Sequence, residues 1–177
     1  MSSGILYALI ATSALASTTT LAADNPASHQ HGHAELQLAI SGNQVDLLFL
    51  SPAYNVVGFE HHARTQAQRQ KADAALFWLE QTPLVNTSEA TCTVHAAATQ
   101  YEVAGADEHN EDKHSQHADF EVTQVLDCPG LEEADSLTTP LTSRFPGLEH
   151  LEVAWAGPEG QGSTRLKHGE DSVSLGR

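Results

Sequence analysis

Basic side chains are scarce in this sequence, and their scarcity argues against two classes of partner. The 177 residues include 8 Lys and Arg against 23 Asp and Glu, which gives a formal net charge of −15. A nucleic-acid-binding protein neutralises phosphates with clustered Lys and Arg, and docking on anionic lipid needs a basic patch. We therefore expect neither nucleic acid nor a charged membrane surface as a partner.

Sulfur is also scarce, because the chain has only two cysteines and one methionine. Copper(I) prefers thiolate and thioether ligands, so a copper(I) site is disfavoured. No Cys-x-x-Cys pair offers a metal–thiolate site either. In an exported protein, a lone pair of cysteines predicts one disulfide, here Cys92–Cys128, closing a loop of about 37 residues.

Charged residues and histidine are absent from the first 23 positions, where an apolar run at 5–16 precedes small residues. This pattern predicts a signal peptide, residues 1–23, cleaved after Ala22 or Ala23. The alternative, a membrane anchor, is disfavoured because the run is shorter than the roughly 20 residues that span a bilayer. Residues 24–177 then form a single domain, long enough to fold without a metal.

Hydrophobic periodicity predicts a mainly β fold. Residues 34–41 alternate between apolar and polar, and the Gly42-Asn43 turn joins them to an apolar strand at 44–50. Helical spacing at 64–81 predicts the principal helix, ended by Pro83. The expected class is α+β, mainly an antiparallel β-sheet or small sandwich, with one principal α-helix packed across it. Further strands are predicted at 92–103, 118–126, 148–154 and 163–167, with a short edge strand at 173–175.

Histidine is abundant, with 11 residues, and most of them fall in three clusters. The first is His29, His31 and His33, in a polar segment (24–33) that we expect to be a mobile N-terminal arm. In an extended backbone, alternate side chains point to the same side, so these three imidazoles would be able to share one metal ion.

The second cluster, Glu60 and His61, directly precedes the predicted helix. Both are interpreted as ligands or as residues that order the turn, and His62 as exposed. The third lies in an acidic loop, 105–117, where three histidines stand among four carboxylates, as in His-rich metal-binding tracts. Its candidate ligands are His109, His114 and His117. Isolated histidines are interpreted as solvated side chains; these are His95, His150 and His168.

Imidazole and carboxylate ligands favour zinc, which binds both in tetrahedral sites. Copper(II) and nickel(II) stay open because they also accept imidazole, whereas calcium takes oxygen ligands alone. Zinc binds neutral imidazole, so binding is expected to weaken as the pH falls through about 6.5. No His-Glu-x-x-His, Gly-x-Ser-x-Gly, phosphate-loop or dinucleotide motif is present, so we expect no enzyme. The alternatives are a zinc-dependent hydrolase with Glu60 as base, and an envelope adaptor for a metal transporter.

Several segments of the sequence resemble the ZrgA-like family of zinc-regulated proteins. They are His29-Gln30-His31-Gly32-His33-Ala34-Glu35-Leu36, Val57-Gly58-Phe59-Glu60-His61, His117-Ala118-Asp119-Phe120 and Phe145-Pro146-Gly147-Leu148. The resemblance implies a periplasmic zinc-binding protein, made under zinc limitation, that captures, buffers or delivers Zn²⁺. The expected partner is a component of a zinc uptake transporter. By matching positions it implies His29, His31, His61 and His117 as ligands, with the acidic loop as a second binder.

Overall fold

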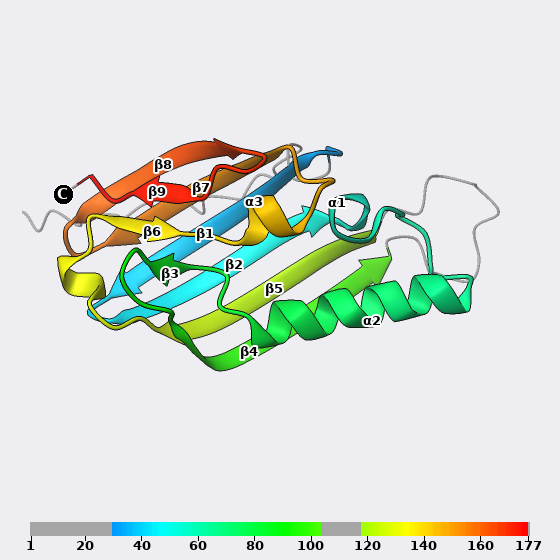
Figure 1. Ribbon diagram of the computed structural model, residues 1–177, viewed down its shortest axis with the longest axis horizontal. Coiled ribbons are helices and arrows are strands. Elements are labelled where there is room, and N and C mark those ends of the chain that lie inside the picture. Colours follow the sequence, from blue (N-terminus) through cyan, green and yellow to red (C-terminus); the bar gives the residue numbers. More distant parts are fainter. Residues whose placement is uncertain (1–29, 104–117, 177) are drawn as a thin grey trace, which may run out of the picture.

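The computed structural model describes residues 30–103 and 118–176, and its main feature is a six-stranded sheet. The strands lie in the order β4-β5-β2-β1-β7-β8 (Figure 1). Together with the helices below, this sheet confirms the predicted mainly β α+β class. In chain order the six strands are β1 (His33–Ser41), β2 (Gln44–Pro52), β4 (Thr93–Val103), β5 (Ala118–Asp127), β7 (His150–Gly157) and β8 (Gly160–Lys167).

The central hairpin of β1 and β2 forms as its alternation predicts. Leu36, Leu38 and Ile40 are buried, whereas residues 37 and 39 between them are exposed. The two strands pair antiparallel up to the Gly42-Asn43 turn. Strand β2 runs to Pro52, two residues beyond its predicted end, and a proline is tolerated there because the strand then gives way to a helix.

The pairing of β1 with β7 is parallel, unlike the other strand pairs of this sheet. The register runs from His33 opposite His150 to Ala39 opposite Ala156. A parallel pair requires a long crossover connection, and here most of the described chain lies between the two strands. Local periodicity contains no information on this pairing, so the sequence does not predict it.

The longest helix, α2 (Gln66–Gln81), matches the helix predicted at 64–81. It begins with a capping box, in which the Thr65 hydroxyl accepts from the Gln68 backbone N–H and the Gln68 side chain accepts from the Thr65 N–H. Its buried face carries Ala72, Ala75 and Leu79 at helical spacing. This face packs against the sheet, mainly along β4.

Three short helical segments were not predicted. They are α1 (Ala53–Val57), the 3₁₀ turn Leu131–Glu133 and α3 (Leu141–Arg144). Each is too short to show a helical hydrophobic period in the sequence, so only tertiary contacts define it. In the two ranges that the structure describes, no helix is both long and apolar enough to cross a membrane.

A second, three-stranded sheet covers part of the first. It has the order β3-β6-β9 and brings together segments far apart in the chain. Figure 1 shows this sheet, α2 and α3 over the same face of the large sheet. Buried Leu137 and Val173 place the core between the two layers. The strands are β3 (Asn86–Thr87), β6 (Ser136–Thr138) and β9 (Ser172–Ser174), the last being the predicted edge strand.

The predicted disulfide is confirmed between Cys92 and Cys128. Cys92 directly precedes β4 and Cys128 directly follows β5, so the bond closes the open end of this hairpin. The other end of the hairpin, where Val103 pairs with Ala118, leads into segment 104–117. The cross-link and the Val103–Ala118 pair therefore lie at opposite ends of the same two strands.

Candidate metal site

Two of the three histidine clusters meet the large sheet at the same end. The register places the beginning of β1, the end of β2 and the beginning of β5 together, since Glu35 pairs with Leu50 and Pro52 pairs with Asp119. This end lies at the right of Figure 1, next to α1. Segment 104–117 leaves β4 and enters β5 there as well. The fold thus gathers chain positions that are far apart in the sequence.

The turn at His31-Gly32-His33 is held by a buried asparagine of α1. The Asn55 side chain accepts from the Gly32 N–H at 2.7 Å and donates to the His33 carbonyl oxygen at 2.7 Å. It also donates to the Ser51 hydroxyl at 3.2 Å, and Asn55 is only 2% exposed. Because the buried Asn55 amide makes all of these hydrogen bonds, it holds the backbone on both sides of Gly32 in place.

The beginning of β7 holds the same turn from the other side. The Gly32 carbonyl oxygen accepts from the backbone N–H groups of Glu149 at 2.8 Å and His150 at 2.7 Å. Just before β7, Gly147 lies against α1, where an added Cβ would approach the Asn55 carbonyl oxygen to 2.8 Å. Glycine at 147 therefore permits the close packing of this turn on α1.

His31 contacts two groups that follow β2. Its Nε2 lies 2.5 Å from Oε1 of Glu60, and its ring stacks on Tyr54 with centroids 4.4 Å apart. The side chain of His31 is 55% exposed and that of Glu60 17% exposed. Glu60 reaches this position because Gly58, with φ of 78°, ends α1 in a left-handed cap and redirects the chain.

The His31–Glu60 pair has the two ligand types that zinc prefers. Zinc binds imidazole nitrogen and carboxylate oxygen at about 2.0–2.2 Å, so a tetrahedral ion would hold the two atoms about 3.3 Å apart. The two side chains would need to move only slightly apart from their hydrogen-bonded positions to accommodate the zinc ion. Alternatively, Glu60 orients His31 by its hydrogen bond while the other ring nitrogen binds the ion.

His61 follows Glu60, with its ring and backbone both held in place. Its Nδ1 lies 2.8 Å from the His62 carbonyl oxygen, so Nδ1 donates and Nε2 keeps the lone pair of the neutral ring. The ring stacks on Phe59, and the Tyr101 hydroxyl donates to the His61 carbonyl oxygen at 3.2 Å. Burial raises the pKa of Tyr101, which keeps this donor protonated. His62 is exposed, as expected.

The sequence matches the family model described as ZrgA family zinc uptake protein over residues 28–175. This match covers most of the chain. The chain belongs to the ZrgA family of zinc uptake proteins. No curated protein matches it. The family confirms the resemblance drawn from the sequence motifs and implies a role in zinc uptake, with zinc as the cargo.

The predicted ligands of this ZrgA family member divide into described and undescribed positions. His31, His33, Glu60 and His61 lie in the described part of the chain. Within residues 30–103 and 118–176, no group of three or more His, Cys, Asp or Glu side chains is placed to hold one metal ion. His31 and Glu60 form a pair, and the side chain of His61 contacts Phe59 and the His62 carbonyl oxygen. The remaining predicted ligands lie outside the described residues; these are His29, His109, His114 and His117.

His33 lies apart from His31, contrary to the expectation of an extended His-x-His-x-His segment. Gly32 has φ of 81°, so the backbone is not extended between them. The His33 ring instead lies 5.0 Å from the ring of His150, across the parallel β1–β7 pair. His150 also differs from its interpretation as a solvated residue, because it is half-buried. No local signal identifies it, since its neighbour is supplied by strand pairing alone.

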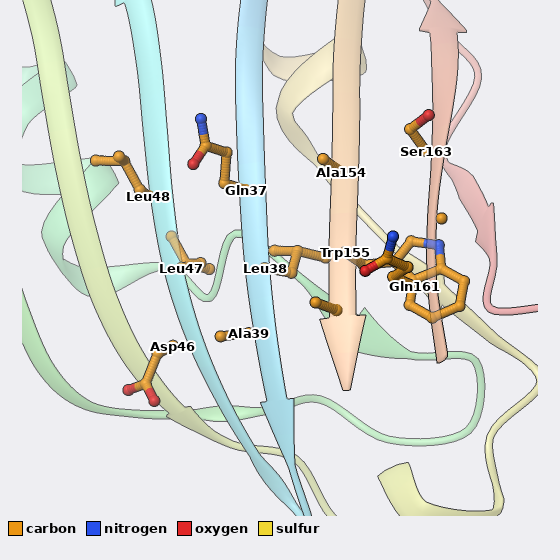
Figure 2. A pocket seen from close by; sticks show the side chains of 12 residues that line it. Gln37, Leu38, Ala39, Asp46, Leu47, Leu48, Ala154, Trp155, Gln161 and Ser163 are labelled. Carbon is orange, nitrogen blue, oxygen red and sulfur yellow. The ribbon is translucent and has the colours of Figure 1, made fainter. Parts of the chain in front are cut away.

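A shallow pocket on the large sheet is a poor candidate for the metal site. It lies over the middle of β1, β2, β7 and β8, among side chains such as Gln37, Ala39, Ala154 and Ser163 (Figure 2). Asp46 is the only acidic residue that lines it, and no histidine does. A zinc ion needs several nitrogen, sulfur or carboxylate ligands, so this surface lacks the required chemistry.

Proposed function

We propose that this ZrgA family member is a periplasmic protein that captures Zn²⁺ and delivers it to an uptake transporter. The observation that carries the proposal is the His31–Glu60 pair, with 2.5 Å between Nε2 and Oε1. An imidazole and a carboxylate this close need only move apart to about 3.3 Å to bind one zinc ion together. His29, His61 and the histidines of the acidic loop, His109, His114 and His117, complete the proposed ligand set.

The exposure of the pair suits capture and release. A structural zinc site has four protein ligands and is closed, whereas a delivery site must exchange its ion. His31 is more than half exposed, so an incoming ligand can reach the ion directly. The net charge of −15 adds a negative field that raises the local concentration of cations.

The proposed location rests on the predicted signal peptide at 1–23 and on the disulfide. Disulfides persist in oxidising compartments such as the bacterial periplasm. We also propose a binding protein without catalytic activity, since the sequence carries none of the common catalytic motifs. Assays of ester, phosphate and amide hydrolysis with and without zinc test this point, and zinc-dependent turnover lost in Glu60→Gln would contradict it.

The deciding experiment is zinc titration by calorimetry on the oxidised protein, beside His31→Ala and Glu60→Gln variants. We expect saturable binding with a near-integral stoichiometry, weakened at least tenfold in each variant. His95→Ala is the matched control, because His95 is exposed on β4, away from the pair. Unchanged zinc affinity in both site variants would exclude His31 and Glu60 as ligands.

The contribution of the undescribed histidines is tested in the same way. A variant with His109, His114 and His117 all changed to Ala should lose zinc equivalents or affinity, and a separate His29→Ala variant tests the arm. If both variants bind zinc like the parent protein, the ligands come from the described residues alone. Delivery is tested by envelope pull-down under zinc starvation, where a zinc uptake transporter component is the expected partner.

A further inference from the structure

His33 and His150 form a second pair of potential ligands, built by the parallel strands β1 and β7. They are register partners, so both side chains project from the same face of the sheet. Their ring centroids are 5.0 Å apart, with 44° between the ring planes. Both residues are half-buried. The pair shares no side chain with the His31–Glu60 pair.

The ring separation matches that of two imidazoles bound to one ion. In a zinc–imidazole complex the metal lies about 2 Å from the nitrogen and hence about 3.1 Å from the ring centroid. Two such rings at the tetrahedral angle have centroids about 5 Å apart. The distance between His33 and His150 is the same, so the backbone already supplies the spacing that a shared ion requires.

An unpaired buried nitrogen is the second observation. Nδ1 of His150 is buried and makes no hydrogen bond in the part of the chain that the structure describes. Leaving a buried polar atom without a partner is unfavourable, and such atoms call for a specific explanation. A lone pair on this nitrogen is a ligand for a metal ion, which would supply the missing partner.

The backbones of both residues are held before any ion binds. The His33 carbonyl oxygen accepts from the Asn55 side chain, and the His150 N–H donates to the Gly32 carbonyl oxygen. The next row on the same face contains Glu35 and Glu152, which are also register partners. Glu152 is ion-paired with Arg165 of β8, and Lys167 of β8 is the register partner of His150, so a site here depends on the two imidazoles and not on these carboxylates.

We propose that His33 and His150 form a second, separate zinc site with two protein ligands. Water or a ligand from a partner protein completes the coordination, so the ion exchanges readily. The proposal rests on the proposed role in zinc binding only for the choice of ion. The two proposed sites use the histidines on either side of Gly32, His31 in the first site and His33 in the second.

The test follows individual imidazoles by two-dimensional ¹H–¹⁵N NMR during titration with zinc chloride, using His33→Gln and His150→Gln for assignment. We expect the His33 and His150 ring signals to change over the same range of zinc concentrations. Each substitution should lower the apparent zinc affinity reported by the other ring at least tenfold. His95→Gln is the control, because His95 is exposed on β4, the edge strand of the large sheet remote from β7. If His33 responds in His150→Gln as in the parent protein, the shared site is excluded.

A His31→Ala, Glu60→Gln double variant separates this proposal from the proposed function. We expect the joint response of His33 and His150 to persist in it. Persistence together with unchanged total zinc binding would remove the His31–Glu60 site and leave the second site standing. Loss of the joint response in a variant whose thermal unfolding is unchanged would show that His33 and His150 do not bind independently, and the second site would fall.

Discussion

At the scale of single residues, Gly32 decides where the histidines of the first cluster point. Its positive φ turns His31 toward Tyr54 and Glu60 and leaves His33 against His150. Residues other than glycine rarely adopt this backbone conformation. The histidines are the candidate ligands, but the glycine between them determines which partners each one meets.

Replacing Gly32 with alanine should weaken zinc binding as well as the fold. The left-handed conformation costs about 1 kcal/mol for alanine, and the new Cβ would lie 3.1 Å from carbon atoms of the Glu149 side chain. Gly169→Ala is a matched control, because Gly169 has φ of 83° with no atom within 4 Å of an added Cβ. Urea unfolding should show a similar loss for both variants, whereas calorimetry should show weaker zinc binding only for Gly32→Ala. Equal zinc affinity in the two variants would contradict a role of this turn in the site.

At the scale of elements, a buried glutamine attaches the end of α2 to the sheet. The Gln124 side chain of β5 donates to the carbonyl oxygens of Leu79 at 2.7 Å and Thr82 at 2.9 Å. It also accepts from the Leu84 N–H at 3.1 Å. The last carbonyl groups of a helix have no partner within the helix, so Gln124 satisfies two groups that burial would otherwise leave unpaired.

Gln124→Leu should therefore destabilise the protein strongly. Leucine fills a similar volume but leaves two buried backbone groups and one part-buried group without this partner, which costs about 3 kcal/mol in the free energy of unfolding. Gln100→Leu on the neighbouring strand β4 is the control, because Gln100 is exposed. Urea denaturation measures both variants. A loss below about 1 kcal/mol for Gln124→Leu would mean that water replaces the amide.

The hairpin of β4 and β5 has its disulfide at the end remote from the candidate site. The Cys92→Ala, Cys128→Ala double variant should lose about 2–4 kcal/mol of stability, because the cross-link restricts the unfolded chain. Zinc affinity should change by less than threefold, since the bond lies at the other end of these strands. Denaturant unfolding and calorimetry measure the two effects. A large loss of affinity in a folded double variant would show that the disulfide also positions the ligands.

At the scale of the whole molecule, we expect the core not to depend on zinc. Buried side chains from both sheets and from α2 form one continuous apolar cluster, including Leu36, Phe49, Leu79 and Phe120. A chain of this size buries enough apolar surface to fold without a metal. In this respect we expect the protein to differ from small domains, in which binding of the metal ion itself drives folding.

Chelation of zinc should therefore leave the fold intact. With EDTA in excess, we expect an unchanged far-ultraviolet circular dichroism spectrum. We also expect a lower Tm than at saturating zinc, because zinc at 100 times its Kd contributes about 2.7 kcal/mol to stability. Loss of the spectrum on chelation would mean that zinc is a structural component and not a cargo. Calcium in place of zinc is the control ion, and it should not restore the higher Tm.

The sequence by itself determined the features that depend on neighbours in the chain. The alternation of Leu36, Leu38 and Ile40 predicted the first hairpin, and the Gly42-Asn43 turn set its register. Helical spacing predicted α2, and the lone cysteine pair predicted the disulfide. The motifs also indicated the family, which the match of the family model over residues 28–175 confirms.

Only the tertiary structure decided which distant residues meet. The pairing of β1 with β7 brought His150 to His33, and the cap at Gly58 brought Glu60 to His31. Periods of 2 and 3.6 residues report which face of an element is buried, but they contain nothing about which elements are neighbours. Strand order results from packing the whole chain around one core. For this reason the sequence offered candidate ligands, whereas only the fold showed which of them are paired.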